Sequence, residues 1–90
     1  MLVTTMRHDG DYFYLTPDVD QLTLEREIVA AVRVGGDFVH FNTHGHGRVS
    51  VFMTAHFPVR FSAAERTDDE VATWEEWPPP MDIDPEGLHS

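Results

Sequence analysis

Four histidines lie near one another in the sequence and are the residues best suited to bind a metal. His40, His44 and His46 have the spacing His-x-x-x-His-x-His, and His56 follows them. Imidazole nitrogen is a common zinc ligand, but ligands of one ion must converge. On a strand, His40 and His44 would stand about 13 Å apart at the usual rise per residue. Only His44 and His46 could approach one ion, with a carboxylate from elsewhere, so we expect no metal and no cofactor.

Other residue types that carry catalysis lack the neighbours they would need. Ser50 and Ser62 have no histidine and carboxylate pairing that the sequence can justify. The loop Gly45-His46-Gly47 has too few glycines for a phosphate cradle, and Glu75-Glu76 reads as a charge pair in an acidic segment. Without a convergent set of groups, we expect a protein that is not an enzyme.

Charge is distributed unevenly along the 90 residues, whose formal net charge is −10. Residues 65–90 hold nine of the sixteen carboxylates and a single basic residue, Arg66. This predicts a domain over residues 1–64 and an acidic tail over 65–90. An acidic chain is repelled by phosphates, so we expect no direct nucleic-acid binding. A tail that mimics nucleic acid and captures a nucleic-acid-binding enzyme stays open as an alternative.

The composition also bears on compartment and stability. The chain contains no cysteine, so no disulfide or thiolate site is available. The N-terminal residues do not have the pattern of a secretion signal, and no segment approaches the roughly 20 apolar residues of a membrane span. We therefore expect a small cytoplasmic domain that does not enter a membrane.

The first half of the chain predicts a hairpin followed by a helix. Residues 2–7 and 12–16 are rich in β-branched and aromatic side chains and flank Asp9-Gly10, a strong turn signal. A helix is expected from Asp20 or Thr23, either a good N-cap, to Arg33, before Gly35-Gly36. Its expected buried stripe is Leu24, Ile28, Ala31 and Val32.

A second hairpin is predicted over residues 38–43 and 48–57. If its loop is Gly45-His46-Gly47, His44 opposes Arg48 and Phe41 opposes Val51. A slip of one residue would mix apolar and polar side chains on one face, which disfavours it. One face then carries Val39, Phe41, Val49, Val51 and Met53, and the same parity continues through Ala55, Phe57, Val59 and Phe61.

These elements predict an α+β fold of ββαββ type, a mainly antiparallel four-stranded sheet with one helix on one face. One helix cannot cover both faces, so the second face must be wet, paired with another subunit or covered by the tail. Six residues of the second hairpin are expected there, and Tyr12 and Tyr14 beside them: Phe38, His40, Asn42, Phe52, Thr54 and His56.

The acidic tail carries its own helix signal. Thr67 and Glu70 have the spacing of a capping box. Val71, Trp74 and Trp77 follow at three-residue intervals on one side of a short helix that ends at Pro78-Pro79-Pro80. Trp-Pro-Pro-Pro also favours a polyproline II segment. We hypothesise that the tryptophans are anchors, buried on the domain or in a partner, the alternative being a solvated acidic tail.

Residues 28–61 contain an apolar helix ending in Arg-x-Gly, an aromatic strand, a turn, and then Gly-Arg-x-Ser-aliphatic-aromatic. The pattern closes with aliphatic-Pro-aliphatic-x-aromatic, and its most specific positions here are Gly47, Arg48, Ser50, Pro58 and Phe61. In this pattern the chain resembles a family of small actinobacterial or actinobacteriophage proteins of unknown function. The tail from Trp74 to Trp77 is not part of it. The resemblance implies a ββαββ fold and no particular mechanism.

Together these observations predict a non-enzymatic module that binds another protein, as an adaptor, assembly component or inhibitor. The alternatives are a structural protein that forms a homodimer through the open sheet face, and the acidic nucleic-acid mimic. The residues predicted to contact the partner come from the sheet face and the tail: Tyr12, Tyr14, Phe38, His40, Phe52, Val71, Trp74 and Trp77.

Overall fold

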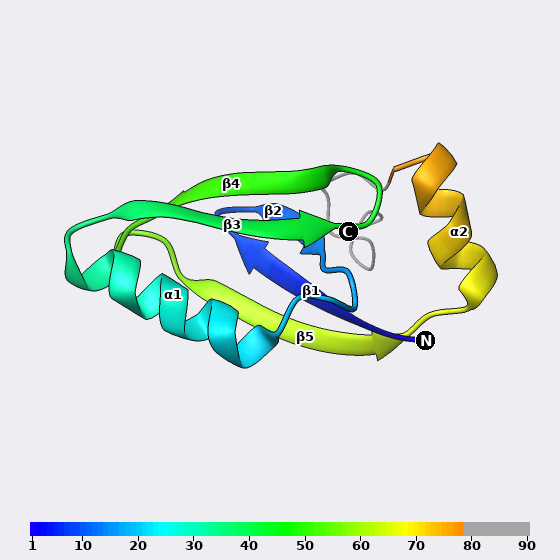
Figure 1. Ribbon diagram of the computed structural model, residues 1–90, viewed down its shortest axis with the longest axis horizontal. Coiled ribbons are helices and arrows are strands. Elements are labelled where there is room, and N and C mark those ends of the chain that lie inside the picture. The colour runs from blue at the N-terminus through cyan, green and yellow to red at the C-terminus, as the bar shows by residue number, and fades with distance from the viewer. Residues whose placement is uncertain (79–90) are drawn as a thin grey trace.

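A computed structural model describes residues 1–78 as an α+β protein with two antiparallel sheets and two helices (Figure 1). The strands are β1 (Leu2–His8), β2 (Asp11–Tyr14), β3 (Asp37–Thr43), β4 (Gly47–Met53) and β5 (Val59–Glu65), and the helices are α1 (Gln21–Arg33) and α2 (Asp68–Glu76). One sheet has the strand order β2-β1-β5, and the other is the hairpin β3-β4. Neither α-helix of the described part is long and apolar enough to cross a membrane.

The two sheets meet at one corner and enclose a single main core. An isolated bridge joins Leu15 to Thr43, and the backbone N–H of His44 donates to the carbonyl of Tyr14 at 2.8 Å. Helix α1 packs against β3 and β4 and places Leu24 and Ala31 in the core. The other buried members of this core come from four strands and the segment after β2: Met6, Phe13, Leu15, Val39, Phe41 and Met53.

Helix α1 begins and ends as the sequence predicts. Asp20 is its N-cap, and its carboxylate accepts a hydrogen bond from the backbone N–H of Thr23. Arg33 lies in the last turn, where a cation is favoured by the helix dipole. Of the expected stripe, Leu24 and Ala31 are buried and Ile28 and Val32 are partly buried, so the 3.6-residue period identifies the packed face.

The connection between β2 and α1 is held by Asp18. Its carboxylate accepts hydrogen bonds from the hydroxyl of Thr16 and, at 2.8 Å, from the side-chain amide of Asn42 in β3. These bonds, that from Thr16 foremost, hold the pKa of Asp18 below its ordinary value because they stabilise the charged form.

Acid is therefore expected to weaken this connection. Because the pKa of Asp18 is depressed in the folded state, its contribution is present above the unfolded pKa of about 3.9 and lost as the pH falls through the folded pKa. Thermal unfolding of the Asp18→Asn variant, compared with the wild type, measures this contribution. The two melting temperatures should differ at neutral pH and converge in strong acid, and a difference that stays constant would contradict it.

The prediction of a single four-stranded sheet is wrong. Residues 59–65 form a fifth strand, β5, that pairs with β1 along its whole length, from Leu2 opposite Glu65 to His8 opposite Val59. Residues 54–57 are not part of β4, which ends at Met53. Of the residues predicted to continue the inner face, Val59 and Phe61 in β5 pack against the core, whereas Ala55 and Phe57 between β4 and β5 are exposed. Parity alone cannot reveal that the chain has left one sheet and joined another.

The predicted register of the second hairpin is also wrong, by two residues. Phe41 lies opposite Val49 and Thr43 opposite Gly47, so the loop is His44-Gly45-His46. A two-residue shift leaves every side chain on its predicted face, so alternation could not detect it. Val39, Phe41 and Met53 are buried as expected, and Val49 and Val51 pack against the same core.

The predicted capping box at the start of α2 is confirmed. The hydroxyl of Thr67 accepts from the backbone N–H of Glu70, and the Glu70 carboxylate accepts from the N–H of Thr67. The helix lies against the domain, at the same end as the β3–β4 turn and the N-terminus (Figure 1). The division into residues 1–64 and 65–90 stays a prediction, and the polyproline segment from Pro79 onward lies outside the described residues.

Candidate interaction surface

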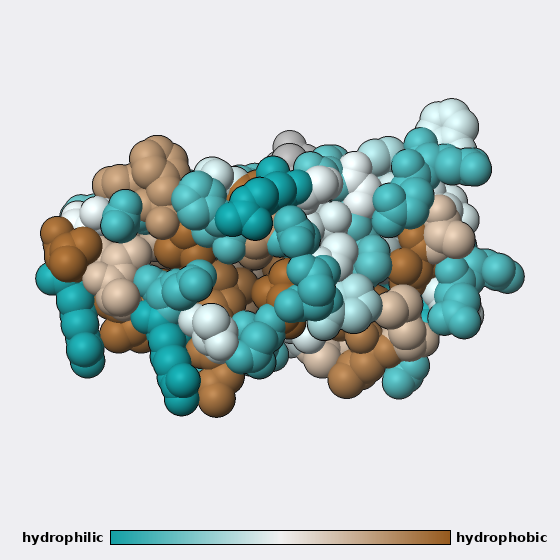
Figure 2. All heavy atoms as spheres, in the orientation of Figure 1, coloured by the Kyte–Doolittle hydropathy of each residue, from teal (hydrophilic) through white to brown (hydrophobic). Residues whose placement is uncertain are grey.

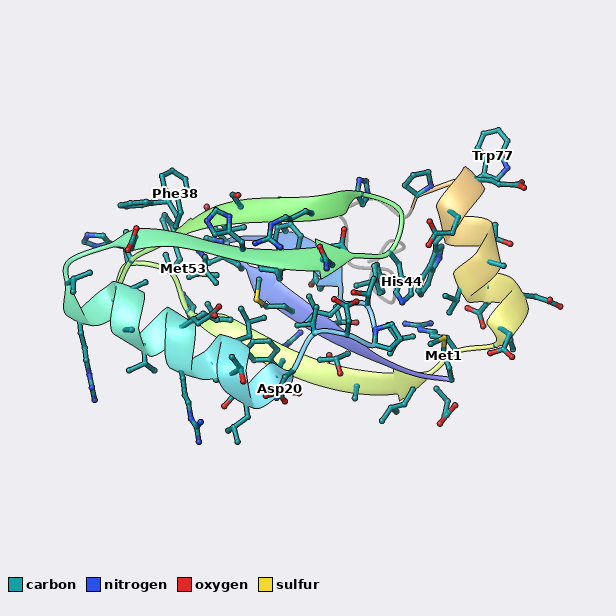
Figure 3. The ribbon with its side chains drawn as sticks, viewed as in Figure 1. Met1, Asp20, Phe38, His44, Met53 and Trp77 are labelled. Carbon is teal, nitrogen blue, oxygen red and sulfur yellow. The ribbon has the colours of Figure 1, made fainter. Side chains whose placement is uncertain are left out.

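The outer face of the hairpin β3–β4 exposes two neighbouring phenylalanines. Phe38 is 58% exposed and Phe52 is 48% exposed, and the two lie directly opposite each other in the register. Their rings meet edge to face with centroids 5.2 Å apart. In Figure 3 the Phe38 side chain points away from α1 and the core. Figure 2 shows hydrophobic side chains gathered at this end of the molecule, where α1 meets β3.

The ring of Phe52 rests directly on Gly36. A Cβ atom at Gly36 would lie 2.7 Å from the Phe52 ring, so only glycine allows this approach. Beside the aromatic pair, Nδ1 of His40 lies 2.6 Å from the hydroxyl of Ser50, its cross-strand neighbour. The outer face therefore carries an ordered set of side chains, defined here as the aromatic face: Phe38, His40, Ser50 and Phe52.

The expectation that Tyr12 and Tyr14 share this face is wrong. Both belong to β2 in the other sheet, and both are buried, with exposed fractions of 6% and 3%. The guanidinium carbon of Arg7 lies 5.4 Å from the centroid of the Tyr12 ring. The error follows from the single-sheet prediction, since residues of two sheets cannot share one continuous face.

Helix α2 packs against β1 and β2, and Trp74 is the one predicted tryptophan anchor that takes part in this contact. Val71 is buried with Val3 and Tyr14, and Trp74 packs against this cluster. The rings of Trp74 and Tyr14 have centroids 4.6 Å apart. This contact uses Val71 and Trp74 within the chain itself, at a different place from the aromatic face.

The β3–β4 turn contacts the same helix. The His44 ring lies 5.9 Å from that of Trp74, and its Nδ1 lies 3.8 Å from the carboxylate of Glu75. His44 is buried, and its Nε2 has no hydrogen-bond partner among the described residues. Within residues 1–78, no three histidine or acidic side chains converge as metal ligands would. The β3–β4 turn thus places His44 against the tail helix, a contact that no sequence signal indicated.

Trp77 is not on the packed side of α2. The helix ends at Glu76, and Trp77 has the backbone angles φ −126° and ψ 82°, so its side chain leaves the stripe of Val71 and Trp74. It is 75% exposed. Figure 3 places Trp77 and Phe38 at opposite ends of the molecule. A role for Trp77 in binding a partner stays a prediction, separate from the aromatic face.

A shallow groove of about 430 Å³ runs between α1 and the start of β3. It borders the aromatic face, because Phe38 and His40 contribute to both. Its remaining wall mixes carboxylates, small apolar residues and one arginine, a composition without a dominant charge: Glu27, Ala30, Ala31, Val34, Asp37, Val39 and Arg48.

Comparison with protein-family models, with curated proteins and with solved structures finds no match. The family resemblance of residues 28–61 therefore stays a prediction. The candidate surface is defined by geometry and exposure alone.

Proposed function

We propose that this protein is a non-enzymatic binding module that holds another protein on its aromatic face. The observation that carries the proposal is the exposed Phe38–Phe52 pair, because the two rings form one apolar patch and aromatic side chains, phenylalanine included, are enriched at protein interfaces. A strand face supports such anchors well, since the backbone of β3 and β4 is already ordered before binding.

The neighbouring polar groups suit the edge of an interface. His40 and Ser50 hydrogen-bond to each other and remain exposed, so they can exchange this bond for one to a partner. Val71 and Trp74 are assigned to the internal contact of α2, which leaves Phe38, Phe52 and His40 as the proposed contact residues.

The proposal predicts that two substitutions on this face abolish capture of the partner. The Phe38→Ser, Phe52→Ser double variant should lose its partner, because truncating an aromatic anchor costs 2 kcal/mol or more, about a 30-fold weaker affinity at each site. The measurement is affinity capture from the lysate of the source organism, with mass spectrometry of the retained proteins.

Trp77→Ser is the matched control, because Trp77 is equally aromatic and more exposed but lies at the opposite end of the molecule. A protein retained by the wild type and by Trp77→Ser, and lost with the double variant, supports the proposal. Identical retention by all three chains, or loss only with Trp77→Ser, contradicts it. Circular dichroism and thermal unfolding of each variant verify that the fold is intact.

A further inference from the structure

Strand β4 is paired along only one of its edges. It bonds to β3 from Gly47 to Met53, and among residues 1–78 no strand lies along its other edge. Its residues are exposed or half-buried except for Met53 at the end. An open edge with unpaired backbone groups is a template for another strand.

The backbone groups that face this open edge can be identified from the printed hydrogen bonds. The carbonyl of Asn42 accepts from the N–H of Thr16, and the N–H of His44 donates to the carbonyl of Tyr14. The backbone N–H and C=O groups of the even-numbered residues of β3 are therefore directed away from β4. Odd-numbered residues of β3 therefore bond to β4, where their partners are Val49 and Val51. The N–H and C=O groups of Arg48, Ser50 and Phe52 are left directed at the open edge.

We infer that this edge pairs antiparallel with the same edge of a second copy of the chain, about a two-fold axis at Ser50. Ser50 is the centre of β4, so this register pairs the strand over its whole length, with Gly47 opposite Met53 of the second copy. It also sets the three outward-directed residues, Arg48, Ser50 and Phe52, against outward-directed residues of the partner strand. A closed two-fold dimer requires such self-complementarity.

The side chains complement each other in the same register. On the outer face, Arg48 lies opposite Phe52 of the second copy, a pair suited to a cation–π contact. On the inner face, Val49 lies opposite Val51, and both are only partly buried in the single chain. Every cross-strand position thus gains a compatible neighbour, and no like charges face each other.

Another edge strand, β5, is less suited to self-pairing. The same arrangement about its centre, Ser62, would set Glu65 opposite Val59 of a second copy. Glu65 already lies 3.5 Å from the N-terminal ammonium of Met1. In such an antiparallel pair each acidic α2 helix follows the C-terminal end of its own β5, so the two helices would lie at opposite ends of the pair and do not separate the two edges. In the β4 dimer each α2 lies beyond the turn end of its own hairpin, so the two helices lie at opposite ends.

The inference does not depend on the proposed function. Edge pairing would extend the two-stranded sheet to four strands and engage Ser50 and Phe52 on β4, while Phe38 and His40 on β3 stay outside the new pairing. The dimer would then present Phe38 and His40 of both copies on one surface.

Substitutions at Ser50 test the dimer through the symmetry of the proposed axis. Sedimentation equilibrium of the full chain should show a monomer–dimer equilibrium. Ser50→Lys and Ser50→Glu, each alone, place like charges opposite each other on the axis and should weaken dimerisation about tenfold or more. An equal mixture of the two variants should recover the dimer, because opposite charges then meet.

Ser50→Pro provides a second test at the same position. Its ring replaces an N–H that faces the open edge, so the β3–β4 bonds survive while edge pairing is blocked. Ser50→Ala is the control, since it removes the hydroxyl but keeps the N–H. A dimer formed by the wild type and Ser50→Ala but not by Ser50→Pro supports the inference. A wild type that remains monomeric, or a dimer indifferent to Ser50→Pro and to the charge variants, overturns it.

Discussion

Replacing Gly45 with alanine is expected to detach helix α2 from the domain and lower the free energy of unfolding by about 3 kcal/mol. Gly45 has a φ of +85°, and a Cβ atom there would lie 2.5 Å from the backbone oxygen of Trp74 and 3.0 Å from Pro78. The left-handed backbone accounts for about 1 kcal/mol of this cost. The rest comes from losing the burial of Val71 and Trp74, worth about 2 kcal/mol together.

Gly47→Ala is the matched control, because Gly47 borders the same turn and also has a positive φ, +67°, but has open space around its Cβ position. It should lose only the backbone contribution of about 1 kcal/mol and keep α2 in place. Tryptophan fluorescence in a Trp77→Phe background reports on Trp74 alone, since the chain has two tryptophans. A red shift with Gly45→Ala and none with Gly47→Ala is expected, and equal spectra would show that the turn does not hold the helix.

Truncation of Met6 is expected to have a comparably large effect on stability. Met6 is fully buried, and its neighbours across β1 are Phe13 in β2 and Phe61 in β5. Met6→Ala removes this contact and leaves a cavity at the centre of the three-stranded sheet, at a cost of about 3 kcal/mol. In a domain of this size each kcal/mol lowers the melting temperature by about 4–8 °C, so a fall of roughly 12–24 °C is expected.

Leu2→Ala is the control for this prediction. Leu2 lies on the same strand but is 63% exposed, so its truncation should change the free energy of unfolding by about 0.5 kcal/mol or less. Urea unfolding of both variants, with the midpoint and slope compared, measures the difference. A Met6→Ala variant as stable as Leu2→Ala would mean that the core does not depend on this position.

The predicted binding residues fall into two separate groups, the α2 contact of Val71 and Trp74 and the aromatic face with Phe38 and Phe52. Gly45→Ala perturbs Trp74 and Val71, whereas the aromatic face lies at the other end of the molecule. If partner capture survives Gly45→Ala and fails with the Phe38→Ser, Phe52→Ser variant, binding and tail docking are separate properties of the chain.

Local sequence determined the features that depend on neighbouring residues. The N-cap at Asp20 and the capping box of Thr67 and Glu70 were predictable, because each depends on side chains within one helical turn. Alternation placed Phe38 and Phe52 on the outer face and Phe41 on the inner face, since strand side chains have a period of two. The exposed candidate site was therefore visible in the sequence as one face of a hairpin.

How these elements combine depends on contacts between distant parts of the chain. The pairing of β5 with β1 joins residues far apart in the chain, from Leu2 with Glu65 to His8 with Val59, and no local pattern distinguishes it from a continuation of β4. The hairpin register differs from the prediction by two residues. A two-residue shift keeps every side chain on the same face, so the alternation of apolar and polar residues cannot detect it. The separation of Trp74, packed on Tyr14, from Trp77, left exposed, depends on where α2 ends and on which surface it meets. These contacts result from long-range packing, which the spacing of residues along the chain does not encode.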